Sequence, residues 1–87
     1  MDKDLLKAKA CAAIDDSAAE IEALANSIAD EPELGFKEVK TSAKVAEFMR
    51  NLGLEPQMGL AINGVKARAK GCKAGPTAAV IGELDAV

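Results

Sequence analysis

The sequence predicts an α+β fold in which two N-terminal helices pack on one face of a three-stranded, mainly antiparallel sheet. Apolar residues recur with helical spacing over residues 2–30, a second amphipathic segment covers residues 37–52, and strand-like segments fill residues 56–87. A chain of 87 residues has the length of one small domain. We therefore expect a single domain, residues 1–87, with a small hydrophobic core and marginal stability.

Residues 2–30 are predicted to form one long amphipathic helix, because apolar side chains recur every three or four residues. This apolar stripe consists of Leu6, Ala10, Ile14, Ile21, Leu24 and Ile28. The other side of the helix is expected to face solvent, and it carries Lys7, Asp15, Asp16, Glu20 and Glu22. The seven-residue spacing of Ile14, Ile21 and Ile28 is also that of a coiled coil, which stays open as an alternative.

The segment DEPELGF, residues 30–36, should end this helix, because Pro32 disfavours a helical residue before it and Gly35 permits a turn. A second helix is expected over residues 37–52, followed by Gly53 at the usual position for a helix end. Its apolar face would be formed by Val45, Phe48, Met49 and Leu52. The two helices then form a hairpin whose apolar faces need a sheet to cover.

Three strands are predicted after Pro56. The segments QMGLAI and VKARAK flank Asn63-Gly64, which is the usual signature of a two-residue hairpin turn with both residues at positive φ. Apolar and basic residues alternate over residues 65–70, so this strand should have one dry and one solvated face. After a second turn at GCKAGP, residues 71–76, the segment TAAVI is apolar on both faces and should be covered on both.

Composition excludes several classes of function. The net charge of -3 and the lack of a basic cluster argue against nucleic-acid and acidic-lipid partners. No apolar run approaches the ~18 residues of a membrane span, and the first residues lack the continuous apolar region of a signal peptide, so the expected location is cytoplasmic.

Cys11 and Cys72 are expected to be free thiols, with a disulfide or a metal pair as the alternative. The chain contains no histidine, which removes the commonest general base and catalytic metal ligand.

Two carboxylates near the end of the chain are the candidate site residues. Glu83 and Asp85 lie two positions apart on the predicted third strand, so their side chains should share one face. Such a pair can hold a hard cation or act in acid–base catalysis, although two oxygen ligands are too few for a specific metal site. An exposed strand end without function is the alternative. Sites in open α/β sheets do form at the carboxyl ends of strands, which favours the functional interpretation.

Most of the chain carries an ordered series of short motifs that together resemble a known family. The resemblance spans residues 21–87 and is to the opening of the aminoacylase-type metallopeptidases, most closely the branch of hippurate and aminobenzoyl-glutamate hydrolases. The motifs are Pro32-Glu33-Leu34-Gly35-Phe36, Glu38, Thr41-Ser42, Gly53-Leu54, Gly64-Val65, Gly75-Pro76-Thr77 and Glu83-Leu84-Asp85-Ala86. The chain corresponds to only the first part of such an enzyme.

The resemblance implies an α+β fragment of an α/β metallopeptidase catalytic domain. Members of this family are two-domain enzymes that hydrolyse amide bonds of N-acyl amino acids or small peptides with one or two zinc or manganese ions. Asp85 matches a family acid that lies beside the metal centre and orients its ligands, and Glu83 lies where many relatives have a metal-binding histidine. The family's Cys/His ligands and glutamate general base correspond to positions beyond Val87. We therefore expect no cofactor in this chain alone and no activity without those segments.

A second hypothesis is a free-standing, non-catalytic interaction module. Two helices can cover only one face of a three-stranded sheet, whereas the segment from Thr77 to Leu84 is apolar on both faces and would be an open edge. We therefore expect a homo-oligomer formed through this strand.

Overall fold

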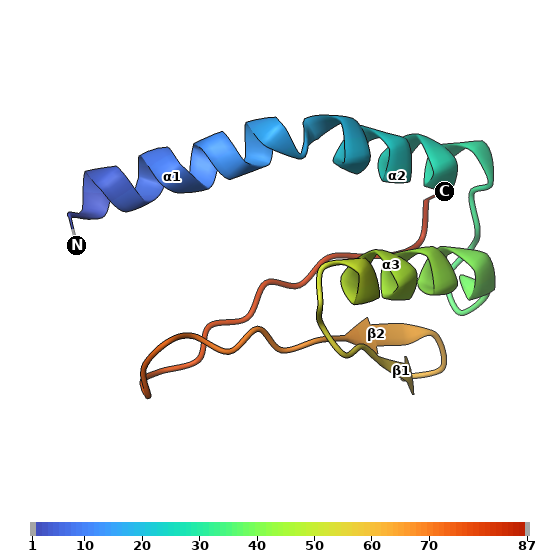
Figure 1. The fold of residues 1–87 in the computed structure, drawn as a ribbon. Helices are drawn as coiled ribbons and strands as arrows, with labels where there is room; N and C mark the ends of the chain where they lie inside the picture. Colours follow the sequence, from blue (N-terminus) through green and yellow to red (C-terminus); the bar gives the residue numbers. More distant parts are fainter. Residues whose placement is uncertain (1, 87) are drawn as a thin grey trace. The chain divides into compact units, whose positions relative to one another are not determined.

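The computed structural model describes residues 2–86, in which three helices and two strands are formed (Figure 1). The α+β character expected from the sequence is confirmed, but the number of strands is not. The chain divides into two compact units, one ending at Asp30 and the other beginning at Glu31. Within residues 2–86, no helix combines the length and the apolarity that crossing a membrane requires.

The first unit contains α1 (Lys3–Asp16) and α2 (Ala18–Asp30), which follow each other almost end to end (Figure 1). The side chain of Asp2 caps α1 by accepting a hydrogen bond from the backbone N–H of Asp4 at 3.2 Å. Ser17 separates the two helices with φ −99° and ψ 3°, yet hydrogen bonds continue across it, from Ser17 N–H to the Ala13 carbonyl and from Ile21 N–H to the Ser17 carbonyl. The predicted single helix over residues 2–30 is therefore two helices that meet at a serine, a weaker helix former than its neighbours.

The second unit begins with a loop and continues into α3 (Val39–Asn51), inside the range 37–52 predicted from the sequence. α3 ends in a Schellman motif: Gly53, at φ 86°, donates to the Arg50 carbonyl, and Leu54 donates to the Met49 carbonyl. Gly53 is required here because other residues strain at this φ. The motif turns the chain away from α3 and into the first strand.

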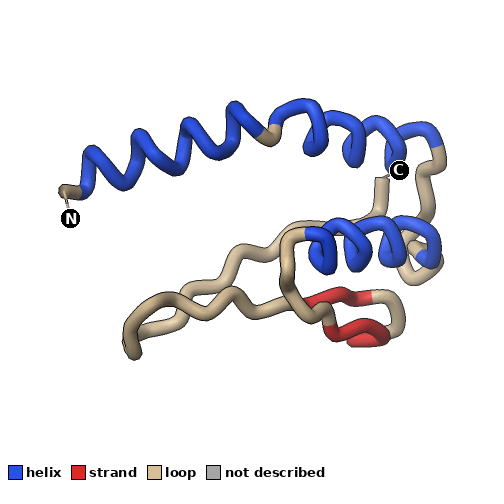
Figure 2. The backbone as a smooth tube through the Cα atoms, viewed as in Figure 1, coloured by secondary structure: helices blue, strands red, loops and turns tan. Residues whose placement is uncertain are grey.

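A short antiparallel hairpin follows, formed by β1 (Gln57–Leu60) and β2 (Gly64–Lys66) (Figure 2). Leu60 pairs with Gly64, so the loop comprises residues 61–63, and the positive φ values fall at Ala61 (45°) and Ile62 (81°). The predicted two-residue turn at Asn63-Gly64 is therefore wrong. Gly64 is required for a different reason: a Cβ atom at this position would lie 2.5 Å from the carbonyl oxygen of Leu60.

The predicted third strand is not formed in the described residues. Residues 67–86 contain no strand, and Val80 and Ile81 have exposed fractions of 102% and 91%. Apolar side chains as exposed as Val80 and Ile81 contribute little to offset the conformational entropy lost when a strand forms, and a two-stranded hairpin is a weak template. One backbone hydrogen bond fixes the far end of the segment, from Ala86 N–H to the Glu33 carbonyl at 3.2 Å.

The core of the second unit is small and lies under α3, which contacts both strands. Its fully buried apolar residue is Ala46, beside Thr41 and Ser42 with exposed fractions of 1% and 4%. Glu38, immediately before α3, is also buried. Because Thr41, Ser42 and Ala46 have small side chains, α3 can approach the hairpin closely, but little apolar surface is removed from water.

Candidate functional site

Glu83 and Asp85 lie in the extended C-terminal segment, and both are exposed. The segment is anchored one residue later, where the backbone of Ala86 donates to the carbonyl of Glu33 in the loop before α3. Within residues 2–86, no group of three or more His, Cys, Asp or Glu side chains is arranged to hold a metal ion. Two carboxylates alone do not fit a zinc site, which takes about three protein ligands, so no catalytic step is assigned to them here.

The loop that receives Ala86 is organised by the carboxylate of Glu33. Its Oε1 accepts a hydrogen bond from the backbone N–H of Thr41 at 2.7 Å, and its Oε2 accepts one from the N–H of Lys40 at 3.2 Å. These are donors of the first turn of α3 that lack partners inside the helix. The hydrogen bond from Thr41 holds the pKa of Glu33 below its ordinary value, since it favours the ionised form. The start of α3 thus already holds an anion supplied by the chain itself.

Glu31 reinforces this arrangement from the solvent side. Its carboxylate forms ion pairs with Lys40 at 3.0 Å and with Lys44 at 3.4 Å. The hydrogen bond from Lys40 is the main reason that the pKa of Glu31 is lowered, and the same contact raises the pKa of Lys40. Both residues of the Glu31–Lys40 pair are exposed, so the pair orders the loop more than it stabilises the fold.

Glu38 links this loop to the hairpin. Its Oε1 accepts a hydrogen bond from the backbone N–H of Phe36 at 3.1 Å, and its Oε2 accepts one from the side-chain amide of Asn63 at 3.3 Å. Phe36 has φ 63°, and Asn63 follows Ala61 and Ile62, which also have positive φ. A single buried carboxylate therefore holds two turns that contain strained backbone.

Glu33 and Glu38 both belong to the motifs that carry the family resemblance, but the sequence alone assigns no role to them or to Glu31. Acidic residues just before a helix are a recognised signal for capping of its N-terminus, and this signal was present in PELGFKE, residues 32–38. What the sequence did not reveal is that Glu33 reaches forward seven and eight residues to make the cap.

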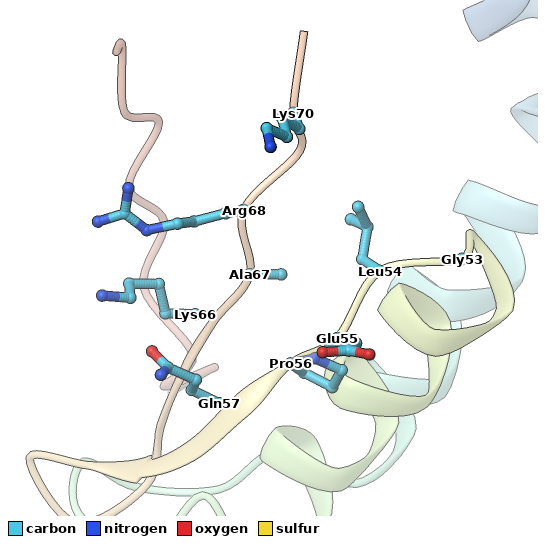
Figure 3. Close-up of a pocket in the computed structure, with 9 residues that line it drawn as sticks. All are labelled: Gly53, Leu54, Glu55, Pro56, Gln57, Lys66, Ala67, Arg68 and Lys70. Atoms are coloured by element: carbon cyan, nitrogen blue, oxygen red, sulfur yellow. The ribbon is translucent and has the colours of Figure 1, made fainter.

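A shallow pocket of about 740 Å³ lies elsewhere in the second unit, between the end of α3 and the segment after β2 (Figure 3). Lys66 and Arg68 project to one side of this segment and Ala67 projects to the other, toward Leu54 (Figure 3). This agrees with the predicted alternation of dry and solvated faces. Neither Glu83 nor Asp85 lines the pocket, whose residues are Gly53, Leu54, Glu55, Pro56, Gln57, Lys66, Ala67, Arg68 and Lys70.

The two cysteines, Cys11 and Cys72, are exposed and free.

The chain is similar to a short part of known hydrolases. It is 39% identical over 61 residues to thermostable carboxypeptidase 2 of Saccharolobus solfataricus, a match that covers 69% of this chain and 16% of the relative. It is 40% identical over 57 residues to thermostable carboxypeptidase 1 of the same organism, covering 64% of this chain and 14% of the relative. A Bacillus subtilis protein, YhaA, whose name assigns it provisionally to the amidohydrolases, is 38% identical over 56 residues, again covering 64% and 14%.

No protein-family profile and no solved structure matches the chain. The similarity to peptidases and amidohydrolases is therefore carried by sequence alone, and it extends over 14–16% of the length of these relatives. The names of the relatives support a fragment of a peptidase or amidohydrolase. They do not distinguish the hippurate and aminobenzoyl-glutamate hydrolase branch from other branches.

Proposed function

We propose that residues 21–87 form the N-terminal part of a metal-dependent hydrolase that cleaves amide bonds of N-acyl amino acids or small peptides. The observation that carries this proposal is the identity of 38–40% to two carboxypeptidases and an amidohydrolase. The ordered motifs from Pro32 to Ala86 support it, because they include both the loop before α3 and the final carboxylates. In this account the chain alone does not catalyse hydrolysis.

Asp85 is the residue of this chain that we propose to act at the metal centre of the complete enzyme. It would orient the groups that bind zinc or manganese, and Glu83 would lie beside them. The anchoring of Ala86 to the loop before α3 supports this role, since it fixes the backbone next to Asp85. The metal ion would supply Lewis acidity and an activated water, and its remaining ligands would come from other segments of the protein.

The proposal is tested on the 87-residue chain by zinc titration and by assays of N-benzoylglycine and short peptides with zinc or manganese. We expect zinc binding weaker than micromolar and no hydrolysis above that of the free metal, since the chain offers no histidine and only two thiols. A Cys11→Ser, Cys72→Ser chain is the control for binding by thiols. A stoichiometric submicromolar site that survives in this control, or saturable hydrolysis, would contradict the account.

Association through the segment from Thr77 to Leu84 is a second proposed function. It is favoured by the exposure of Val80 and Ile81, which form an apolar surface on an extended segment. Among the described residues, no strand pairs with this segment. Such a segment is suited to pairing with the edge of a sheet in another copy of the chain.

A further inference from the structure

The extended segment after β2, which carries Asp85, is held to the rest of the second unit near its end. Residues 71–83 are all exposed, and Leu84 is the first residue after them that is partly buried. Two residues later, the N–H of Ala86 donates to the carbonyl of Glu33 at 3.2 Å. The segment makes no other backbone hydrogen bond to a described residue. The backbone position of Asp85 therefore depends on the position of Glu33.

Glu33 is itself held in place by its side chain. One carboxylate oxygen accepts a hydrogen bond from the N–H of Thr41 at 2.7 Å, and the other accepts one from the N–H of Lys40 at 3.2 Å. Bonds from two adjacent amides of one helix to an ionised carboxylate are strong and leave the side chain little rotational freedom. The carbonyl that receives Ala86 is therefore fixed relative to the first turn of α3.

The other two carboxylates of the loop before α3 do not make this connection. Glu31 forms ion pairs with two lysines of α3 at the surface, and Glu38 bonds to the loop itself and to Asn63 of the hairpin. Among the described residues, no hydrogen bond joins either of these glutamates to the segment after β2. Glu33 is thus the acidic residue of the loop whose hydrogen bonds reach both α3 and the segment.

We propose that Glu33 is a positioning residue for Asp85: its carboxylate fixes the loop to α3, and its carbonyl fixes the backbone beside Asp85. This inference rests on the proposed hydrolase function, in which Asp85 orients the groups that bind the metal ion. Such sites are sensitive to small displacements, since a misplacement of about 1 Å can lower the rate on the order of 100-fold. Loss of the carboxylate of Glu33 should therefore release Asp85 while α3 stays folded.

Backbone amide relaxation, measured by NMR on the 87-residue chain, tests this inference. We expect order parameters of about 0.8 for the amides of Asp85 and Ala86, and values below about 0.6 for both in the Glu33→Ala chain. The amides of α3 should keep their order in that variant. The matched control Glu47→Ala removes an exposed carboxylate of α3 and should leave Asp85 and Ala86 as ordered as in the original chain.

Two further variants separate positioning from a general loss of stability. Glu33→Gln keeps one side-chain oxygen that can accept from Thr41, so the order of Asp85 should be intermediate. Ala46→Gly weakens α3 at its centre without touching the loop, and below its melting transition Asp85 should stay ordered. A disordered Asp85 in the original chain, an ordered one in Glu33→Ala, or equal disorder in Ala46→Gly would overturn the proposal.

These NMR measurements involve neither metal binding nor hydrolysis. If they fail, Glu33 does not position Asp85, whereas the proposed hydrolase function is decided by its own assays. Failure of this inference and failure of the proposed function are therefore distinguishable.

Discussion

The carboxylate of Glu33 accepts a hydrogen bond from the backbone N–H of Thr41 at 2.7 Å, and this contact ties the loop before α3 to the first turn of that helix. The side chain of Glu33 caps α3, while its carbonyl oxygen receives the N–H of Ala86 at the end of the chain. One residue thus connects the start of α3 with the segment that carries Glu83 and Asp85. The loop before α3 is therefore the structural base of the candidate site.

The stability of the second unit should depend on pH through Glu33. Because the pKa of Glu33 is lowered in the folded chain, its stabilising contribution is present above the ordinary value of 4.5 and is lost as the pH falls through the folded pKa. In the Glu33→Gln variant, the melting temperature measured by circular dichroism should fall less between pH 6 and pH 3 than in the original chain. The control Glu47→Gln removes an exposed carboxylate of α3 and should keep the original pH profile. Identical profiles for all three chains would mean that Glu33 does not cap α3.

Glu38 and Asn63 should be energetically coupled, because the amide of Asn63 donates to a buried carboxylate. A double-mutant cycle with Glu38→Ala and Asn63→Ala should give a coupling free energy of about 1 kcal/mol in urea unfolding. The matched cycle with Glu47→Ala in place of Glu38→Ala should give a value near zero. Additive effects in the first cycle would show that the loop before α3 and the hairpin are held together by other contacts.

Gly64 should tolerate no side chain. A methyl group at this position would lie 2.5 Å from the Leu60 carbonyl, and a backbone atom cannot move aside without opening the hairpin. Gly64→Ala should therefore reduce the free energy of unfolding by about 1–3 kcal/mol. Gly71→Ala is the control, because a Cβ atom there meets nothing within 4 Å, and its effect should be within about 0.5 kcal/mol. A harmless Gly64→Ala substitution would place the hairpin turn elsewhere.

Val80 should promote association of the chain through the segment from Thr77 to Leu84. It is fully exposed in an extended segment, so Val80→Lys removes apolar surface and adds a charge that opposes edge pairing. The substitution should therefore weaken or abolish self-association of the chain in sedimentation velocity. Ala74→Lys, which adds the same charge in the preceding exposed turn, is the control. Unchanged self-association of the Val80→Lys chain would exclude this segment as an association surface.

The helices were predictable from the sequence because their apolar spacing and end signals are local. Gly53 identified the end of α3, and Pro32 identified the break before it. The break at Ser17 was missed, since a serine within a helical pattern is only a weak signal. The hairpin turn was placed two residues too late. A glycine after asparagine normally indicates positive φ, whereas Gly64 is needed for its close approach to Leu60.

The third strand could not be predicted reliably because strand formation depends on contacts distant in the sequence. The apolar pattern of TAAVI indicates a strand with cover on both faces, and the described residues supply a partner at neither Val80 nor Ile81. The capping role of Glu33 was missed for the same reason, since its donors lie seven and eight residues away. Glu83 and Asp85 stay predicted site residues, exposed and next to an anchored backbone.

A chimeric enzyme tests the central claim most directly. Residues 21–87 would replace the corresponding stretch of thermostable carboxypeptidase 2 of Saccharolobus solfataricus, and peptide hydrolysis and bound metal would be measured. We predict an active, metal-containing chimera in which Asp85→Asn lowers metal affinity or kcat/KM by about 10–100-fold, while Glu47→Gln has no effect. A folded chimera that hydrolyses no peptide, or one in which Asp85→Asn retains full activity and metal, would contradict the assignment of this chain to the metal-centre side of such a hydrolase.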